Sequence, residues 1–184
     1  GEVKMIVMKF GGSSLADAER IKHVVDIIKM YMEKQPILVL SALGKTTDNL
    51  LDAGQKALKA NIDITEIKDH HLQTCKELNI DNQPVNQLLD ELSSLLNGIS
   101  MLQELNPRTD DYLVSFGERL SVRVISLYLD SIGIKSKYYD AWDIGFVTDS
   151  VFKYAELLPE TYQNISETFA ELKNNYDITP IIMK

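Results

Sequence analysis

Near the start of the chain, Val3-Lys4-Met5-Ile6-Val7-Met8-Lys9-Phe10-Gly11-Gly12 forms an apolar run that stops at two glycines. A near-continuous run of this kind is typical of a strand buried on both faces, and such strands occur in parallel sheets. Beyond the glycines, Ser14 and Asp17 approximate a capping box, and the apolar residues of 21–32 recur at helical spacing. This stretch therefore predicts a strand, a tight loop and a helix.

The same alternation of strands and helices continues along the chain. We expect further strands at 37–40, 134–140 and 178–183, and helices at about 48–59, from 113 to near Gly133, and at 162–176. Residues 61–106 differ, because two helical stripes follow each other there and predict an antiparallel pair of helices packed on the rest of the protein. The pattern as a whole indicates an α/β layered fold with a mainly parallel sheet.

Composition narrows the class of protein. The 184 residues are enough to form one hydrophobic core. With 19 basic and 27 acidic residues the net charge is −8, which argues against an extended electrostatic binding surface for nucleic acid or anionic lipid. A single cysteine, Cys75, excludes an internal disulfide, and no apolar stretch is long enough to span a membrane. We expect a soluble, cytoplasmic protein without a membrane or nucleic-acid partner.

The first loop carries residues suited to phosphate binding. Lys9 ends the strand, and Gly11 and Gly12 would let backbone N–H groups approach a phosphate while the lysine supplies a positive charge. The alternative is a purely structural glycine turn with Lys9 reaching to water. Local sequence leaves both interpretations open.

A second polar corner follows the next strand, at Ser41 to Thr47. Gly44-Lys45-Thr46 resembles the end of a P-loop, but Val39 stands where that motif requires glycine, so the motif is absent. In a parallel sheet the two corners would lie at the same edge and form one convergent polar site.

A glycine and a carboxylate interrupt an otherwise good helix at Ser115-Phe116-Gly117-Glu118-Arg119. Glycine inside a helix costs up to about 1 kcal/mol relative to alanine, so close approach by a ligand or another backbone would explain Gly117. Glu118 is either a site residue or an exposed acid paired with a nearby cation.

The histidines and the cysteine favour structural roles. His71 and Cys75 are spaced to share a metal ion, but core packing is the preferred interpretation because further ligands are missing nearby. We expect His70 at the surface and Trp142 in the core.

Four segments, in this order, together resemble aspartate kinase (aspartokinase), within the amino acid kinase superfamily. They are Lys9-Phe10-Gly11-Gly12-Ser13-Ser14, Ser41-Ala42-Leu43-Gly44-Lys45-Thr46-Thr47-Asp48-Asn49-Leu50, Val114-Ser115-Phe116-Gly117-Glu118 and Tyr139-Asp140-Ala141-Trp142-Asp143-Ile144-Gly145-Phe146. The first is typical of the whole superfamily, and the second and third are more specific. The resemblance covers essentially the whole chain and implies a three-layer α/β/α fold, carbamate kinase-like, with a helical insertion at about 61–106.

The resemblance also implies an activity and a site. The family transfers a phosphoryl group from ATP, with Mg²⁺ bound mainly through ATP, to the side-chain carboxylate of L-aspartate, the first step towards lysine, threonine and methionine. Carried over by motif, Lys9 would be catalytic, and Lys9, Phe10, Gly11, Gly12 and Ser13 would bind the ATP phosphates. Ser41, Thr47 and Glu118 would hold aspartate, with Glu118 facing its α-ammonium group, and no protein metal ligand is implied.

Departures from the family pattern shape the remaining expectations. Ser13 replaces the usual threonine and keeps the hydroxyl, whereas Asp48 replaces a common asparagine and adds a charge beside the aspartate site. The family's later Gly-Arg-Gly-Gly-Ser-Asp loop, adenine pocket and ACT domains have no counterpart in the chain. We therefore expect 1–184 to be the N-terminal, aspartate-binding portion of an incomplete kinase domain, inactive alone, whose parent enzyme is a homo-oligomer.

Two alternatives remain from sequence. The chain could belong to a kinase of another small carboxylate in the same superfamily, or it could be a non-catalytic binding fragment.

Overall fold

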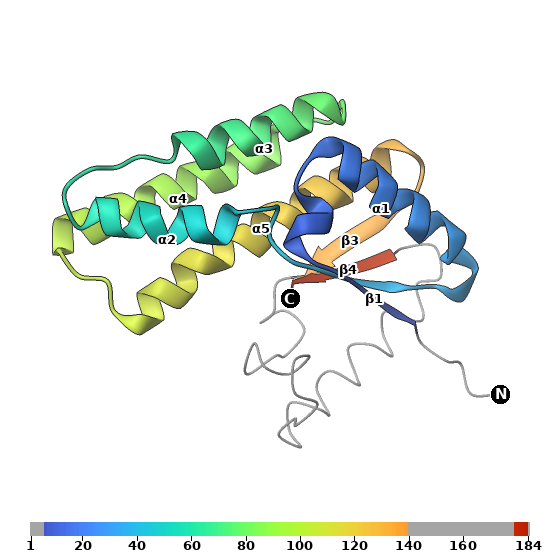
Figure 1. The fold of residues 1–184 in the computed structure, drawn as a ribbon, viewed down its shortest axis with the longest axis horizontal. Helices are drawn as coiled ribbons and strands as arrows, with labels where there is room; N and C mark the ends of the chain where they lie inside the picture. The colour runs from blue at the N-terminus through green and yellow to red at the C-terminus, as the bar shows by residue number, and fades with distance from the viewer. Residues whose placement is uncertain (1–5, 140–178, 184) are drawn as a thin grey trace, which may run out of the picture.

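A computed structural model of the protein describes residues 6–139 and 179–183 (Figure 1). Four strands form one sheet in the order β1-β2-β4-β3, and every pair of neighbours is parallel. The strands are β1 (Val7–Phe10), β2 (Ile37–Leu40), β3 (Ser136–Tyr139) and β4 (Thr179–Met183). The predicted parallel sheet is confirmed.

Helices supply most of the remaining described structure. They are the short turns η1 (Gly12–Leu15) and η2 (Met32–Lys34), and the helices α1 (Ala18–Met30), α2 (Thr46–Ala57), α3 (Thr65–Glu77), α4 (Gln83–Leu102) and α5 (Pro107–Ser131). From α2 to α5 the helices run alternately away from the sheet and back towards it (Figure 1). The pair of helices predicted at about 61–106 corresponds to α3 and α4, and these two run antiparallel.

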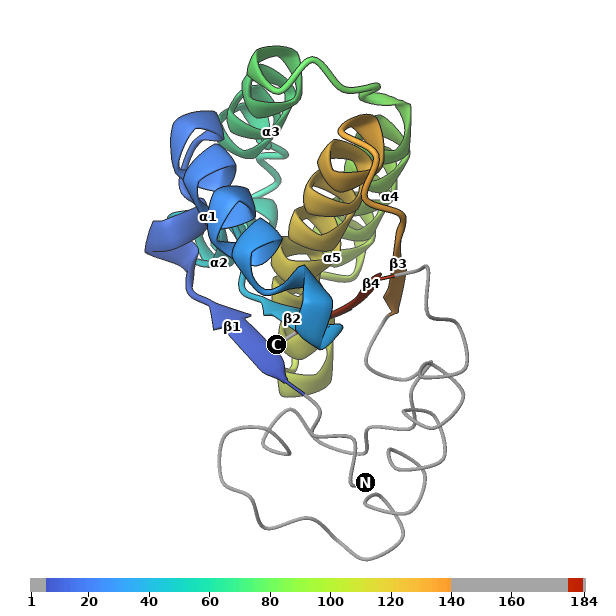
Figure 2. The same ribbon diagram turned by 90° about the vertical axis from the view of Figure 1, so that its right-hand side faces the viewer.

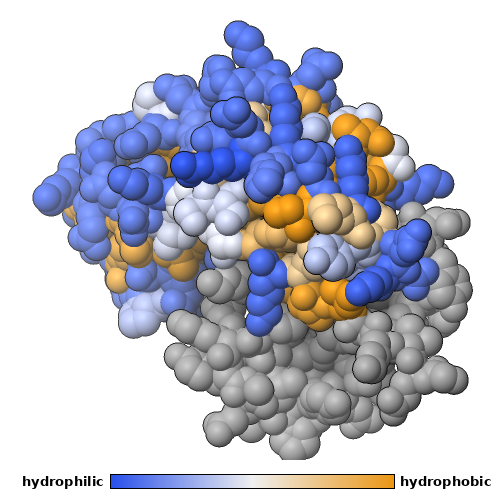
Figure 3. Space-filling view, turned by 45° about the vertical axis from the view of Figure 1, so that its right-hand side comes forward, coloured by the Kyte–Doolittle hydropathy of each residue, from blue (hydrophilic) through white to orange (hydrophobic). Residues whose placement is uncertain are grey.

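One hydrophobic core joins the sheet to the helices. Figure 2 shows α1 and α5 on the same side of the sheet, and Leu38 and Leu40 of β2 are buried with residues of these helices. Ile37 and Val39 face the other way and are buried with Ile182. Strand β2 is therefore buried on both faces, as its sequence predicts. On the face seen in Figure 3, hydrophilic residues cover most of the described helical surface and hydrophobic residues gather towards the middle.

Strand β1 differs from its sequence prediction. Met8 and Phe10 pack against the main core, but Val7 is 39% exposed and Lys9 is exposed. Burial on both faces was thus the wrong interpretation of this apolar run. The reason lies in the sheet order, because β1 has a strand partner on one side only among the described strands.

Two helix starts also differ from prediction. Helix α1 begins after Asp17, whose carboxylate accepts a hydrogen bond from the Arg20 N–H at 2.8 Å, so Asp17 and not Ser14 caps it. Helix α2 begins at Thr46, two residues before the predicted start. The helix predicted at 162–176 and Trp142 lie outside the described residues.

Candidate functional site

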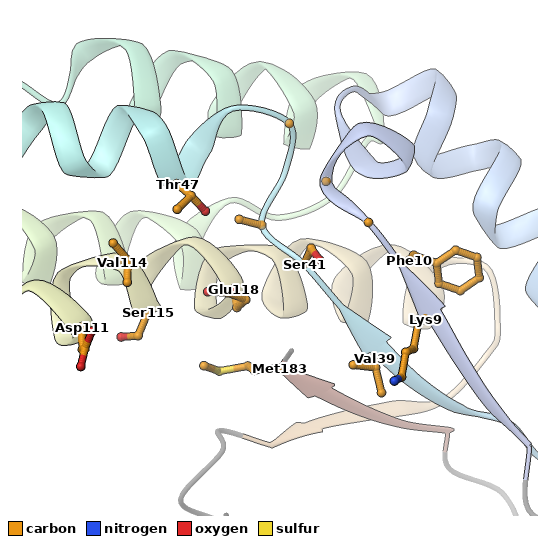
Figure 4. Close-up of a pocket in the computed structure, with 14 residues that line it drawn as sticks. Lys9, Phe10, Val39, Ser41, Thr47, Asp111, Val114, Ser115, Glu118 and Met183 are labelled. Carbon is orange, nitrogen blue, oxygen red and sulfur yellow. The ribbon is translucent and has the colours of Figure 1, made fainter. Parts of the chain in front are cut away.

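A cavity of about 650 Å³ opens at the carboxyl ends of the parallel strands, a volume suited to a small-molecule ligand. Its walls come from the ends of β1, β2 and β4, from the loops after β1 and β2, from the first turn of α2, and from one face of α5 (Figure 4). The lining residues are Lys9, Phe10, Gly11, Gly12, Val39, Ser41, Ala42, Gly44, Thr47, Asp111, Val114, Ser115, Glu118 and Met183.

The two loops of this cavity are joined through their backbones. The Ser41 N–H donates to the Phe10 carbonyl at 3.1 Å, and the Gly44 N–H donates to the Gly12 carbonyl at 2.9 Å. A Cβ atom on Gly12 would lie 2.9 Å from the Ala42 carbonyl oxygen, so a side chain at this position would push the loops apart. Gly11 is different, because a Cβ there would have nothing within 4 Å. The glycine turn therefore has a crowded side, towards the second loop, and an open one.

Gly117 lets helix α5 approach the second loop. A Cβ on Gly117 would lie 2.8 Å from the Ala42 Cβ, 3.4 Å from Leu50 Cδ1 and 3.7 Å from Thr47 Oγ1. Close approach of another chain segment thus explains the glycine inside the helix. Because Glu118 follows directly, the same contact carries its carboxylate to the cavity between Thr47 and the end of β4 (Figure 4).

Most of the predicted site residues meet in this cavity. Lys9, Phe10, Gly11, Gly12, Ser41, Thr47 and Glu118 all line it, although they come from three separate parts of the chain. Ser13 does not line it; this residue is exposed, and its carbonyl accepts from the Arg20 guanidinium at 3.2 Å. The Phe10 ring packs against the core, and the Phe10 carbonyl accepts the hydrogen bond from the Ser41 N–H.

The lining has positive and negative groups in different places. Lys9 is paired in register with Val39 and projects from the same face of the sheet, whereas Phe10 points away from it (Figure 4). Glu118 and Asp111 both project from α5. A ligand that carries both an anionic and a cationic group therefore finds complementary charges within one cavity.

Two lining residues, Asp111 and Met183, are not among the site residues predicted from the sequence. Asp111, Ser115 and Glu118 occur at i, i+4 and i+7, so they share one face of α5, and this spacing could have found Asp111. Met183 reaches the cavity only because β4 lies beside β2 in the sheet. That neighbourhood follows from the topology and has no local signal in the sequence.

His71 and Cys75 pack in the core, as predicted. His71 Nδ1 donates to the Ile67 carbonyl at 2.7 Å, and burial lowers the pKa of the imidazole to about 4. The pKa of the Cys75 thiol is raised to about 11, mainly by burial and to a smaller extent by the negative charge of Asp81. Within the described ranges, no group of three or more His, Cys, Asp or Glu side chains is placed to hold a metal ion.

His70 differs from its prediction as a surface residue. Its side chain is half-buried, and Nε2 lies 2.6 Å from the Ala16 carbonyl oxygen. The sequence could not show this, because the two residues are 54 positions apart.

None of the helices in residues 6–139 and 179–183 has the length and apolar character needed to cross a membrane.

Comparison with known proteins places this geometry in a family. The amino acid kinase family profile matches residues 4–184. Aspartokinase 1, chloroplastic, of Arabidopsis thaliana is 49% identical over 168 residues, which are 88% of this chain and 30% of that protein. Aspartokinase 2, chloroplastic, of the same plant is 42% identical over 99% of this chain and 35% of its own length. The chain thus spans about a third of the length of these relatives.

Solved structures agree on the fold. Escherichia coli aspartokinase III in complex with aspartate and ADP matches with a TM-score of 0.75 at 20% identity, over 98% of this chain and 40% of that one. Clostridium acetobutylicum aspartate kinase matches with a TM-score of 0.71 at 24% identity, over 97% of this chain and 38% of that one. The predicted amino acid kinase fold is confirmed, and the chain belongs to the amino acid kinase family.

Proposed function

We propose that this chain is the N-terminal, aspartate-binding portion of the kinase domain of an aspartokinase. The complete protein would transfer the γ-phosphoryl group of ATP to the side-chain carboxylate of L-aspartate and form 4-phospho-L-aspartate. The observation that carries the proposal is one cavity that combines Lys9 and an open glycine turn with Glu118 and two hydroxyl-bearing residues, Ser41 and Thr47. The aspartokinase relatives support it, and since they are about three times as long as the matched part, the activity is proposed for the complete protein.

The phosphate end of the cavity would lie at β1. The open side of Gly11 leaves room for a phosphate, and the backbone of Gly12 is held in place by its bond to Gly44. Lys9 would place its ammonium group on the phosphoryl group as negative charge develops during transfer. Ser13, exposed at the start of η1, would contact the same phosphates from outside the cavity lining.

The aspartate end would lie between α2 and α5. Glu118 would accept hydrogen bonds from the α-ammonium group, which is the one cationic group of the substrate. The close contact at Gly117 brings Ala42 and Thr47 against α5, and Ser41, the residue before Ala42, also lines the cavity. The hydroxyls of Ser41 and Thr47 could therefore donate to the carboxylates. The carboxylate that receives the phosphoryl group would then face Lys9.

This arrangement suits the chemistry of an acyl phosphate. A carboxylate is already deprotonated at neutral pH, so the nucleophile needs no general base. Catalysis then consists of bringing two anions together in line and neutralising their charge. ATP supplies the phosphoryl group when bound, and we propose that Mg²⁺ is held mainly by its phosphate oxygens.

The remaining aspects of the proposal concern the cellular setting. The product would enter the synthesis of lysine, threonine and methionine, as the family resemblance implies. The single, buried cysteine supports a reducing compartment such as the cytoplasm. We also propose that the complete enzyme is a homo-oligomer.

Trapping the product with hydroxylamine tests the proposal directly. The protein expressed from its complete reading frame, incubated with ATP, Mg²⁺ and L-aspartate, should form aspartyl hydroxamate, and Lys9→Ala should abolish it. Formation of hydroxamate from glutamate or N-acetylglutamate but not from aspartate would favour a kinase of another small carboxylate. Failure of every carboxylate, together with absence of ATP and aspartate binding by calorimetry, would contradict the proposal and favour a non-catalytic role.

A second assay tests the proposed division of the enzyme. The isolated 184-residue chain should give no aspartate-dependent ATP turnover. Turnover by this chain that is lost in Lys9→Ala would contradict the proposed need for the rest of the protein.

A further inference from the structure

His70 connects the helical insertion to the first loop of the candidate site. The residue lies on α3, and its Nε2 atom is 2.6 Å from the carbonyl oxygen of Ala16, which directly follows the turn η1. Because a carbonyl oxygen can only accept, Nε2 carries the hydrogen and donates it. The bond joins segments 54 residues apart in the sequence.

The second loop also lies next to Ala16 and His70, through Gly44. Gly44 has a φ of +54°, and a Cβ built on it would lie 3.4 Å from the Ala16 Cβ and 3.6 Å from His70 Cε1. Gly44 is also the residue whose N–H binds the Gly12 carbonyl. Ala16, Gly44 and His70 thus bring the end of the first loop, the middle of the second loop and α3 into one cluster.

Helix α3 is packed into the core around His70. Ile67 and His71 are buried in the core, one turn apart on the inner side of the helix. The His71 ring lies against the His70 ring with centroids 5.3 Å apart, and Thr74 Oγ1 donates to the His70 carbonyl at 2.7 Å. His70 therefore projects towards the loops from a fixed base.

We propose that His70 is a positioning residue. From α3 it holds the first loop (residues 11–16), assigned to the phosphates, and the second loop (residues 41–47), assigned to aspartate, in their relative places. This inference rests on the proposed function, because it assigns the two loops to the two reactants. His70 does not line the cavity and would touch neither reactant. Its effect would be on the distance and alignment between them, to which group transfer is very sensitive.

Kinetics of the enzyme from its complete reading frame test the inference. His70→Ala should lower kcat at least about tenfold, since a displacement of about 1 Å can cost up to about a hundredfold. The KM values for aspartate and ATP should change less than about threefold, because the binding groups remain. His70→Gln places an amide N–H where Nε2 lies and should restore most of kcat. His23→Ala, which removes an exposed histidine of α1, is the matched control and should leave kcat unchanged.

Amide hydrogen exchange separates a local from a global effect. In His70→Ala the amides of residues 11–16 and 41–47 should exchange faster, while the urea midpoint of unfolding stays close to that of the His70→Gln protein. The inference is overturned if kcat is unaffected in His70→Ala, if His70→Gln restores nothing, or if exchange in both loops is unchanged. If the unmodified enzyme shows no aspartate-dependent turnover, the proposed function fails, and the exchange comparison still decides whether His70 holds the loops.

Discussion

At the scale of single residues, His71 shows what burial does to a titratable group. The side chain is fully buried on α3, and its Nδ1–H donates to the Ile67 carbonyl. Protonation would place a charge in the core, so the pKa falls from 6.5 to about 4. The folded protein therefore holds this histidine neutral at pH 7.

This shift predicts a loss of stability in acid. The folded-state pKa lies below the unfolded value of 6.5, so the contribution of His71 is complete above pH 6.5 and is lost as the pH falls towards about 4. Between pH 7 and pH 5 this histidine alone should lower the free energy of unfolding by about 2 kcal/mol. Urea denaturation of the 184-residue chain at a series of pH values measures it.

A variant isolates this residue from the other titrating groups. His71→Gln cannot take up a proton in this range, so its stability should fall less steeply over the same interval. Identical pH profiles for the two proteins would show that His71 does not control acid stability.

At the scale of elements, glycines decide how closely helices and loops approach. Gly117 on α5 has the Ala42 side chain against it, whereas a Cβ on Gly98 of α4 would have nothing within 4 Å. Both glycines lie in helices, so both would gain helix propensity on substitution by alanine. Only Gly117 would meet another segment of the chain.

The pair gives a matched test of this packing. Gly98→Ala should raise the free energy of unfolding by up to about 1 kcal/mol. Gly117→Ala should instead lower it by about 1 kcal/mol, because overpacking costs about 1–3 kcal/mol and exceeds the gain in propensity. Urea midpoints of the two variants are the measurement, and equal stabilisation by both would contradict the close approach of α5 to Ala42.

The sequence predicted the elements better than their surroundings. Apolar spacing predicted β2, β4 and the described helices, and it correctly predicted that β2 is buried on both faces. The same kind of run in β1 led to the wrong interpretation, since burial of a strand depends on its place in the sheet. The start of α1 was misplaced because Ser14 and Asp17 both carry capping side chains, and only the fold selects Asp17.

The candidate site was predictable to the extent that motifs carry it. Lys9, Gly12, Thr47 and Glu118 are in the cavity as expected. Asp111 adds a second carboxylate that no motif indicated, and the contact of His70 with Ala16 joins segments too distant for any local pattern. Such long-range neighbours follow from topology and not from spacing along the chain.

At the scale of the whole molecule, the net charge of the chain disfavours the binding of anions. The chain has a net charge of −8, and the reactants proposed for it are anions. Binding must then depend on a few local groups, and the cavity places Lys9 at the sheet edge and Glu118 on α5. We propose that these two groups serve different reactants, Lys9 the phosphates and Glu118 the α-ammonium group of aspartate.

Steady-state kinetics of Glu118→Gln in the enzyme from its complete reading frame test this claim most directly. Loss of a hydrogen bond between charged groups is worth about 1.5–3 kcal/mol, so the KM for aspartate should rise about tenfold to a hundredfold while the KM for ATP stays within about twofold. Glu104→Gln, at an exposed position in the loop before α5, is the control and should match the unmodified enzyme. An unchanged KM for aspartate in Glu118→Gln, or an equal rise for both substrates, would contradict the assignment.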